Sequence, residues 1–213
     1  MLFDDVRERL RTIPVDLPIG PRELIPRLVP PGGATALRGI SEWASGPRDG
    51  AALVLLYPDG AGETHVLLTE RTTGDFRHSG EVSFPGGAVD PHDLTFEAAA
   101  LREAREEVAL VPEAAGVTVV GRLGVVEIRA SGFRLHPILA LAEHAPRGLV
   151  PDPREVAAIL EVPLRRFLPG APIELVDAER DGVRFRYGAF PWGEYRIWGA
   201  TASVLGQLGS LLL

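Results

Sequence analysis

The sequence contains no cysteine, which excludes disulfide bonds, thiolate zinc sites and cysteine nucleophiles. It also contains no lysine, because all 22 basic side chains are arginines. A lysine Schiff base and the lysine of a phosphate-binding P-loop are therefore excluded as well. These two absences remove several classes of covalent and phosphate-binding chemistry before any motif is considered.

A long apolar run is absent too. No stretch reaches the roughly 18 apolar residues of a membrane span. Residues 1–13 are charged and have no apolar signal core, so we expect a cytoplasmic protein. The net charge of −7 argues against a nucleic-acid partner, which usually meets a basic patch. An acidic protein can still bind anionic phosphates when divalent metal ions lie between the two.

The composition is that of a globular protein with a substantial core, at 46% hydrophobic and 24% charged over 213 residues. We expect residues 1–45 to form an N-terminal arm, with a short helix over 3–12 and a Pro/Gly-rich segment after it. Residues 46–213 are expected to form the main domain. The arm could pack on its own domain or on a second subunit, so a homodimer is possible.

The main domain mixes predicted strand pairs with a few helices. Apolar runs over 51–57 and 65–69 flank a Pro-Asp-Gly turn and predict a hairpin, followed by a loop over 70–84. A helix is predicted over 93–109, with Asp93 as its N-cap. The later predicted elements are strands over 117–128 and 133–141, a short helix over 153–160, a hairpin of 173–176 with 183–187, and a helix over 197–213. This mixture favours an α/β domain with helices on both faces of a sheet.

Three glutamates lie on one face of the helix predicted over 93–109. Glu103, Glu106 and Glu107 are three and four residues apart, and like charges at this spacing cost a few tenths of a kcal/mol per pair. A cation among them would relieve the repulsion, and hard oxygen ligands suit Mg²⁺ or Mn²⁺. The alternative is an ordinary solvated acidic face, with Arg102 and Arg105 in surface ion pairs.

The double glycine upstream favours the metal site over the solvated face. Gly87 can adopt backbone angles closed to other residues, so its carbonyl can reach a metal ion. The chain then reads Arg102-Glu103-Ala104-Arg105-Glu106-Glu107-Val108-Ala109-Leu110.

This combination resembles the signature of the Nudix family. That signature is Gly, five residues, Glu, seven residues, then Arg-Glu-apolar-any-Glu-Glu-any-Gly-apolar. The chain departs from it in three places. Asp93 stands where the first Glu is expected, eight residues separate it from Arg102, and Ala109 replaces the Gly. We refer to Glu103, Glu106 and Glu107 below as the box glutamates.

Two of these departures, the Asp and the extra residue, are the form found in the coenzyme A pyrophosphatase branch of the family. Other segments are similar to that branch as well. These segments are 67–71, 80–87, 131–137, Glu155-Val156 leading into 162–164, and 197–202.

The resemblance implies the Nudix fold, an α/β/α sandwich with a mixed sheet. It also implies a small-molecule partner, coenzyme A or a derivative, hydrolysed to 3′,5′-ADP and 4′-phosphopantetheine. Two alternatives stay open. One is a Nudix hydrolase of another nucleoside diphosphate derivative, such as ADP-ribose or NADH. The other is a non-catalytic Nudix binding module, which the substitution at Ala109 mildly favours and the intact glutamates disfavour.

The family's metal ligands carry over to the three box glutamates and the Gly87 carbonyl. Arg102 is then expected to orient a box carboxylate through a bidentate pair. Asp93 either caps the helix or supports the metal site from behind.

The general base stays open. It is either Glu103 or a later acid among Glu127, Glu155 and Glu161, of which Glu155 lies in a matched segment and is preferred.

Two arginines, Arg71 and Arg77, are candidates for holding substrate phosphates, since a guanidinium suits bidentate phosphate contact. Their alternative role is that of solvated loop residues. Phe133 and Trp198 are expected in the core rather than stacked on adenine, and His136 is expected at a strand end.

Overall fold

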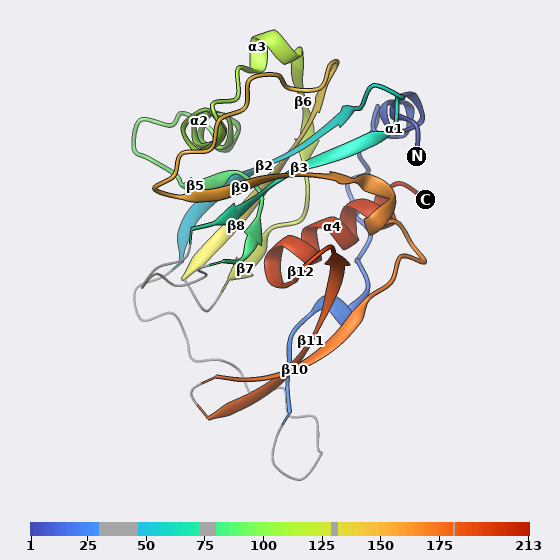
Figure 1. Ribbon diagram of the computed structural model, residues 1–213, viewed down its shortest axis with the longest axis vertical. Coiled ribbons are helices and arrows are strands. Elements are labelled where there is room, and N and C mark those ends of the chain that lie inside the picture. The colour runs from blue at the N-terminus through green and yellow to red at the C-terminus, as the bar shows by residue number, and fades with distance from the viewer. Residues whose placement is uncertain (30–46, 73–79, 129–131, 181) are drawn as a thin grey trace.

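The computed structural model describes residues 1–29, 47–72, 80–128, 132–180 and 182–213. Its main feature is an eight-stranded mixed sheet built on two parallel strands, β2 (Arg48–Pro58) and β8 (Phe133–Ala142) (Figure 1). The run 51–57 of β2 is buried throughout, as is typical of a parallel strand covered on both faces. The predicted apolar run is therefore the centre of the sheet.

The remaining strands of the main sheet flank this parallel pair. They are β3 (Thr64–Arg71), β4 (Val82–Ser83), β5 (Gly86–Ala88), β6 (Val117–Arg122), β7 (Val126–Ile128) and β9 (Val156–Pro163). The predicted hairpin is confirmed, because β3 runs antiparallel to β2. The strand predicted over 117–128 is two strands, β6 and β7, which pair one after the other with β8.

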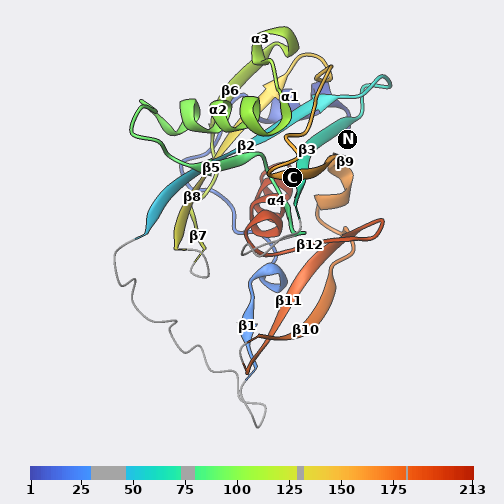
Figure 2. The same cartoon turned by 60° about the vertical axis from the view of Figure 1, so that its left-hand side comes forward.

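Helices cover both faces of the sheet (Figures 1 and 2). Helices α2 (Phe96–Val108) and α3 (Pro112–Ala115) lie on one face, and α1 (Phe3–Arg9) and α4 (Gly199–Leu211) lie on the other. Alternate residues of β2 point into two separate cores, Leu53 and Leu55 toward α2 and Val54 and Leu56 toward α4. The predicted α/β/α sandwich is therefore confirmed. Within the described ranges, no helix has the length and apolar character that a membrane crossing requires.

Strands β2 and β3 splay apart, and the chain from β4 to β5 fills the gap. β3 pairs with β2 only near the hairpin, through residues 64–66. Farther along, β4 pairs with β3 and β5 pairs with β2. Between them the Leu53 N–H donates to the Pro85 carbonyl at 2.8 Å. This insertion places the double glycine at the centre of the sheet, beneath α2.

A second, smaller sheet projects from the main body, at the bottom of Figure 1. It contains β10 (Glu174–Arg180), β11 (Val183–Trp192), β12 (Tyr195–Ile197) and β1 (Arg27–Leu28). The hairpin predicted over 173–187 is confirmed as β10 and β11, and the predicted closing helix is α4.

The described residues of the N-terminal arm pack on their own chain. Leu24, in the short 3₁₀ helix η1 (Arg22–Leu24), is buried in the core beside α4. The Pro18 carbonyl accepts a hydrogen bond from Gln207 Nε2 at 3.0 Å, and β1 pairs with β11. Residues 30–46 lie outside the described residues.

The helix predicted over 153–160 is wrong, because this segment is strand β9. Residues Ala157 and Ala158 favour a helix by intrinsic propensity, but β3 offers β9 an open edge along its whole length. Backbone pairing from Arg71 to His65 outweighs that preference. The loop predicted over 70–84 is also too long, since β3 continues to Arg71 and β4 lies within it.

Both ends of α2 differ from the expected pattern. The N-cap is Thr95, whose hydroxyl accepts from the Ala98 N–H at 3.1 Å, so the prediction of Asp93 as cap is wrong. At the other end Ala109 adopts the left-handed conformation, with φ 53° and ψ 32°. This is the position where the family signature has Gly, and a side chain there is strained.

Replacing Ala109 by Gly should stabilise the protein by about 1 kcal/mol, because relief of the left-handed strain exceeds the entropy cost of Gly. Urea unfolding followed by circular dichroism measures the effect. The matched control is Ala98→Gly, an exposed right-handed position on the same helix, which should lose about 1 kcal/mol. Equal losses in both variants would contradict the strain at Ala109.

Candidate active site

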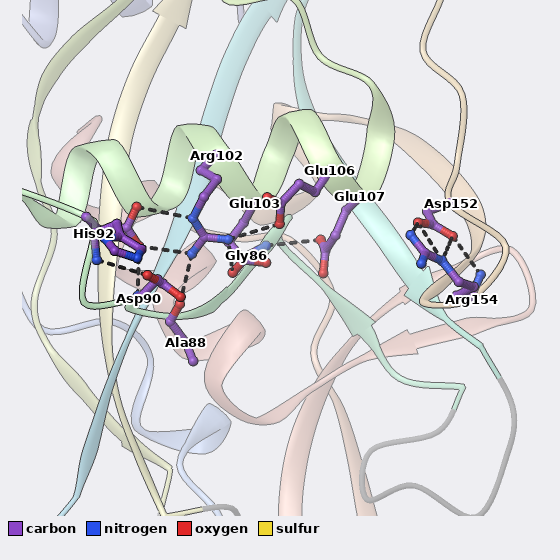
Figure 3. Close-up of polar contacts among 11 residues, drawn as sticks. Gly86, Ala88, Asp90, His92, Arg102, Glu103, Glu106, Glu107, Asp152 and Arg154 are labelled. Atoms are coloured by element: carbon purple, nitrogen blue, oxygen red, sulfur yellow. Dashed lines mark hydrogen bonds and ion pairs between the residues drawn. The ribbon is translucent and has the colours of Figure 1, made fainter.

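The box glutamates project from α2 toward the double-glycine segment (Figure 3). The approach is close: a Cβ on Gly87 would lie 2.6 Å from Glu103 Oε2. A Cβ on Gly86 would lie 2.5 Å from the Ala51 carbonyl oxygen in the neighbouring strand. Glycine is therefore required at position 86, where the close atoms belong to the backbone, whereas a side chain at position 87 would displace the Glu103 carboxylate from its place against the strand.

Glu107 is the buried member of the three, with 3% of its surface exposed. Its Oε2 accepts from the Gly86 N–H at 3.1 Å, and Arg71 Nη1 lies 3.9 Å from its Oε1. Burial raises the pKa of Glu107 to about 7, and the charges of Glu103 and Glu155 add to the rise. The Gly86 N–H and the Arg71 guanidinium act in the opposite direction.

Arg102 connects the helix to the loop that precedes it (Figure 3). Its Nε and Nη2 donate to the two oxygens of Asp93 at 3.1 and 2.9 Å, and Nη2 also donates to the Ala88 carbonyl. Its Nη1 lies 2.8 Å from Glu103 Oε1 and 2.9 Å from Glu106 Oε2. The hydrogen bond from Arg102 lowers the pKa of Asp93. Asp93 therefore anchors the guanidinium that contacts two box glutamates.

Glu103 and Glu106 occupy different surroundings. The Glu103 side chain is 13% exposed and the Glu106 side chain 59%. Burial raises the pKa of Glu103 although the Arg102 guanidinium lies beside it. In this conformation, no three His, Asp or Glu side chains among the described residues are arranged to hold a metal ion. The box glutamates lie on one face, but Glu106 is paired with Arg102 and Glu107 with the Gly86 N–H.

Of the later acids, Glu155 lies closest to this site. It is exposed, it directly precedes β9, and its charge contributes to the raised pKa of both Glu103 and Glu107. Its carbonyl accepts from the Thr72 N–H at 3.0 Å, which fixes it beside the end of β3. Glu161 is farther along β9 and accepts from the Tyr57 hydroxyl at 2.8 Å. Glu127 lies on β7, opposite Arg134.

Of the two arginines predicted to contact phosphate, the structure describes only Arg71. Arg71 lies at the end of β3 with its side chain 36% exposed, next to Glu107. Arg77 falls outside the described residues. The contact between Arg71 and Glu107 joins two segments far apart in the sequence, so no local pattern could have predicted it.

The aromatic residues and His136 are placed by the sheet. Phe133 is half-buried, and the Arg48 guanidinium lies over its ring, with Cζ 4.5 Å from the ring centroid. His136 lies inside β8 rather than at a strand end, so that prediction is wrong. Its ring stacks on Phe96 at 3.7 Å, and its Nε2 lies 2.8 Å from Asp49 Oδ1. Sequence reasoning missed this cluster because its members come from three separate elements.

Comparison with known proteins agrees with this geometry. The model of the NUDIX domain matches residues 46–179. NudL of Cronobacter sakazakii, an uncharacterized Nudix hydrolase, is 40% identical over 147 residues, covering 68% of this chain and 74% of that protein. NudL of Salmonella paratyphi B is 39% identical over 144 residues, covering 67% and 72%.

The chain therefore belongs to the Nudix family. It is a hydrolase of a nucleoside diphosphate derivative, and Nudix hydrolases generally use divalent metal ions. Among solved structures, a MutT/nudix family protein from Enterococcus faecalis superposes with a TM-score of 0.50 at 15% identity. The superposed region covers 80% of this chain and 63% of the Enterococcus faecalis protein. At this level of identity the similarity supports the fold alone.

The burial of Glu107 predicts a pH-dependent cost to the metal-free protein. Its pKa rises from the ordinary 4.5 to about 7 on folding, so the folded state favours the protonated acid. The contribution of Glu107 to stability is full below pH 4.5 and is lost as the pH rises through about 7. In EDTA, Glu107→Gln should therefore be more stable than the unmodified protein at pH 8, by up to about 3 kcal/mol.

Chemical unfolding at pH 4.5 and pH 8 measures this difference. The gain of the Glu107→Gln variant should shrink toward zero at the lower pH. The control Glu106→Gln, at an exposed position, should show little gain at either pH. A pH-independent effect of Glu107→Gln would contradict the buried ionisation.

Proposed function

We propose that this Nudix hydrolase cleaves the pyrophosphate of coenzyme A or its derivatives, giving 3′,5′-ADP and 4′-phosphopantetheine. The supporting observation is that separate segments similar to the coenzyme A pyrophosphatase branch meet at one place. The Arg71 N–H donates to the Glu81 carbonyl, and Glu155 is fixed beside Thr72. The Gly86 N–H donates to Glu107. Residues that are dispersed in the sequence thus surround a single group of carboxylates.

The proposed metal ligands are the Gly87 carbonyl and the box glutamates, and the proposed ion is Mg²⁺ or Mn²⁺. The donor set fits, because every ligand is a hard oxygen. Glu107 also fits, since it is a buried carboxylate with one backbone N–H and a distant guanidinium for partners, and a cation would favour its ionised form. Glu106 would leave Arg102 to join the set. When bound, the ions would polarise the phosphate oxygens and acidify a water molecule.

The side chains of the protein supply binding, orientation and proton transfer. Asp93 holds Arg102, and Arg102 holds Glu103 in position, so this chain of contacts preorganises the site. We assign the general base to Glu155, whose exposed carboxylate can accept a proton from the attacking water. The water oxygen bonds to one phosphorus of the pyrophosphate and the bridging P–O bond breaks. Each product keeps one of the two pyrophosphate phosphorus atoms, and 3′,5′-ADP keeps the 3′-phosphate as well.

Arg71 is proposed to bind a substrate phosphate, together with Arg77, which lies six residues farther along the chain. Coenzyme A carries a 3′-phosphate in addition to its pyrophosphate, which adds to the need for guanidinium groups. Arg71 is suitably placed, because it is partly exposed and reaches to within 3.9 Å of a box glutamate.

The first test is a product assay with Mg²⁺ or Mn²⁺ on coenzyme A, acetyl-coenzyme A, ADP-ribose, NADH and diadenosine polyphosphates. We expect 3′,5′-ADP and a phosphopantetheine product, identified by mass. Glu106→Gln and Glu107→Gln should each lower turnover by orders of magnitude while circular dichroism stays unchanged. Each substitution removes a charge needed to hold the metal ions.

The control for these variants is Glu113→Gln, an exposed acid paired with Arg105 away from the site, which should retain full activity. Full activity in both box variants would reject the metal assignment. Preferred turnover of ADP-ribose or a dinucleotide would reject the coenzyme A assignment, and no turnover with either metal would favour a binding module.

The second test concerns the 3′-phosphate. The unmodified enzyme should have a lower KM for coenzyme A than for 3′-dephospho-coenzyme A, and Arg71→Ala or Arg77→Ala should reduce that difference about tenfold. Arg105→Ala, an exposed arginine on α2, is the control and should keep it. If the Arg71→Ala and Arg77→Ala variants both discriminate as well as the unmodified enzyme, neither arginine binds the 3′-phosphate.

A further inference from the structure

Helix α2 meets the sheet beneath it mainly through small side chains. Its fully buried apolar residues are Ala99, Ala100 and Ala104, with Val108 at the C-terminal end. Alanines form only shallow ridges, so this interface by itself resists sliding or tilting of the helix weakly. The position of α2 over the sheet is therefore fixed largely by the contacts at its two ends.

The C-terminal end of α2 is held by backbone hydrogen bonds. The Val150 N–H donates to the Val108 carbonyl at 3.1 Å, and the Asp152 N–H donates to the Glu107 carbonyl at 2.8 Å. These bonds fix the part of the helix that carries Glu107. Glu103 lies about one turn nearer the N-terminus, so its position depends more on the other end of the helix.

The N-terminal end of α2 is held by side chains from the sheet. The ring of Phe96, the first residue of α2, stacks on the ring of His136 from β8, with the centroids 3.7 Å apart and the planes inclined by 10°. The Arg122 guanidinium from β6 lies 5.3 Å from the centroid of the Phe96 ring. Arg122 also donates two hydrogen bonds to the carboxylate of the next residue, Glu97. Two adjacent residues of the first turn are thus held by two neighbouring strands.

His136 is itself held in place and is connected to the double-glycine segment. Its side chain is 12% exposed, and its Nε2 lies 2.8 Å from Asp49 Oδ1. Since an ionised carboxylate only accepts hydrogen bonds, Nε2 is the donor. The Asp49 carbonyl accepts from the N–H of Val89, two residues after Gly87, at 3.1 Å. Asp49 and His136 therefore fasten the double-glycine segment and the first turn of α2 to the same place on the sheet.

We propose that His136 is a positioning residue of the metal site and that it acts through Phe96. By fixing the first turn of α2 relative to the double-glycine segment, the stacked pair sets the place where the Glu103 carboxylate meets Gly87. The tolerance is small, since a Cβ on Gly87 would lie 2.6 Å from Glu103 Oε2. A displacement of α2 by the rise of a single residue, about 1.5 Å, would separate these two proposed ligands. The inference rests on the proposed metal ligands and is independent of the proposed substrate.

The contacts of Arg102 depend on the same placement of the helix. Its partners Asp93 and Ala88 precede α2, whereas Glu103 lies on it. Movement of the first turn relative to the preceding loop would change both sets of contacts. Loss of the stacked pair would therefore reach Glu103 by two routes, directly through the helix and indirectly through Arg102.

The affinity for Mn²⁺, measured from the electron paramagnetic resonance signal of the free ion, tests this role without substrate or turnover. Phe96→Leu keeps an apolar side chain but removes the stacked ring, and it should weaken Mn²⁺ binding about tenfold, as does the loss of other groups that orient metal ligands. Phe96→Tyr keeps the ring and should bind Mn²⁺ normally. His136→Leu removes the other half of the pair, should weaken binding to a similar extent, and provides a second variant should Phe96→Leu fail to fold.

The matched control is Phe167→Leu. Phe167 packs edge-on against Phe190 in the core on the α4 side, with the centroids 5.2 Å apart. This variant also loses a ring contact and should unfold at a lower urea concentration, but its affinity for Mn²⁺ should be unchanged. A purely stabilising role of the Phe96 ring would instead give the same pattern in Phe96→Leu and Phe167→Leu.

The proposal is overturned if folded Phe96→Leu and His136→Leu bind Mn²⁺ as tightly as the unmodified protein, or if Phe167→Leu weakens binding as much as they do. Failure of the proposed function gives different results. Full Mn²⁺ affinity in Glu107→Gln rejects the proposed metal ligands and this inference with them. Absence of coenzyme A turnover, together with the expected order of Mn²⁺ affinities, rejects only the substrate and supports the role of His136.

Discussion

The close approach of α2 to the double glycine is the constraint on which the site depends. The splay between β2 and β3 admits the segment from β4 to β5, and the absence of a side chain at Gly86 lets it lie against Ala51. The absence of a side chain at Gly87 lets Glu103 reach the backbone. A carboxylate can therefore meet main-chain groups in the middle of a sheet, where polar groups are usually already paired.

Arg102 extends this constraint to the rest of the site. Its fork joins Asp93, the Ala88 carbonyl and two box glutamates, so one side chain fixes the loop and the helix relative to each other. Asp93 thus serves the site rather than the helix end, where Thr95 is the cap. Asp93 stands where the family signature has Glu, and its carboxylate is held in one position by the two hydrogen bonds from Arg102.

Local patterns made the central elements predictable, and distant contacts limited the rest. The apolar run of β2, the helix carrying the box glutamates and the last helix follow from periodicity and breakers in their own segments. The local pattern did not predict strand β9, because the pairing of β9 with β3 overrides the helix propensity of its alanines. The contact of Arg71 with Glu107 and the packing of the Tyr187 ring on Trp198 each require the tertiary structure, as does the left-handed Ala109.

The pairing of residues 18–29 with residues 184–207 has a consequence for biosynthesis. The Val29 N–H donates to the Arg184 carbonyl at 2.8 Å, and Gln207 donates to the Pro18 carbonyl, so these early residues pair with residues that are synthesised much later. Closing so long a loop costs entropy before any contact compensates for it. The part of the sheet that α4 covers therefore stays exposed until α4 itself has been synthesised. Apolar residues such as Val54 and Leu56 are exposed during that interval, and a chaperone that shields apolar surface would act on this protein then.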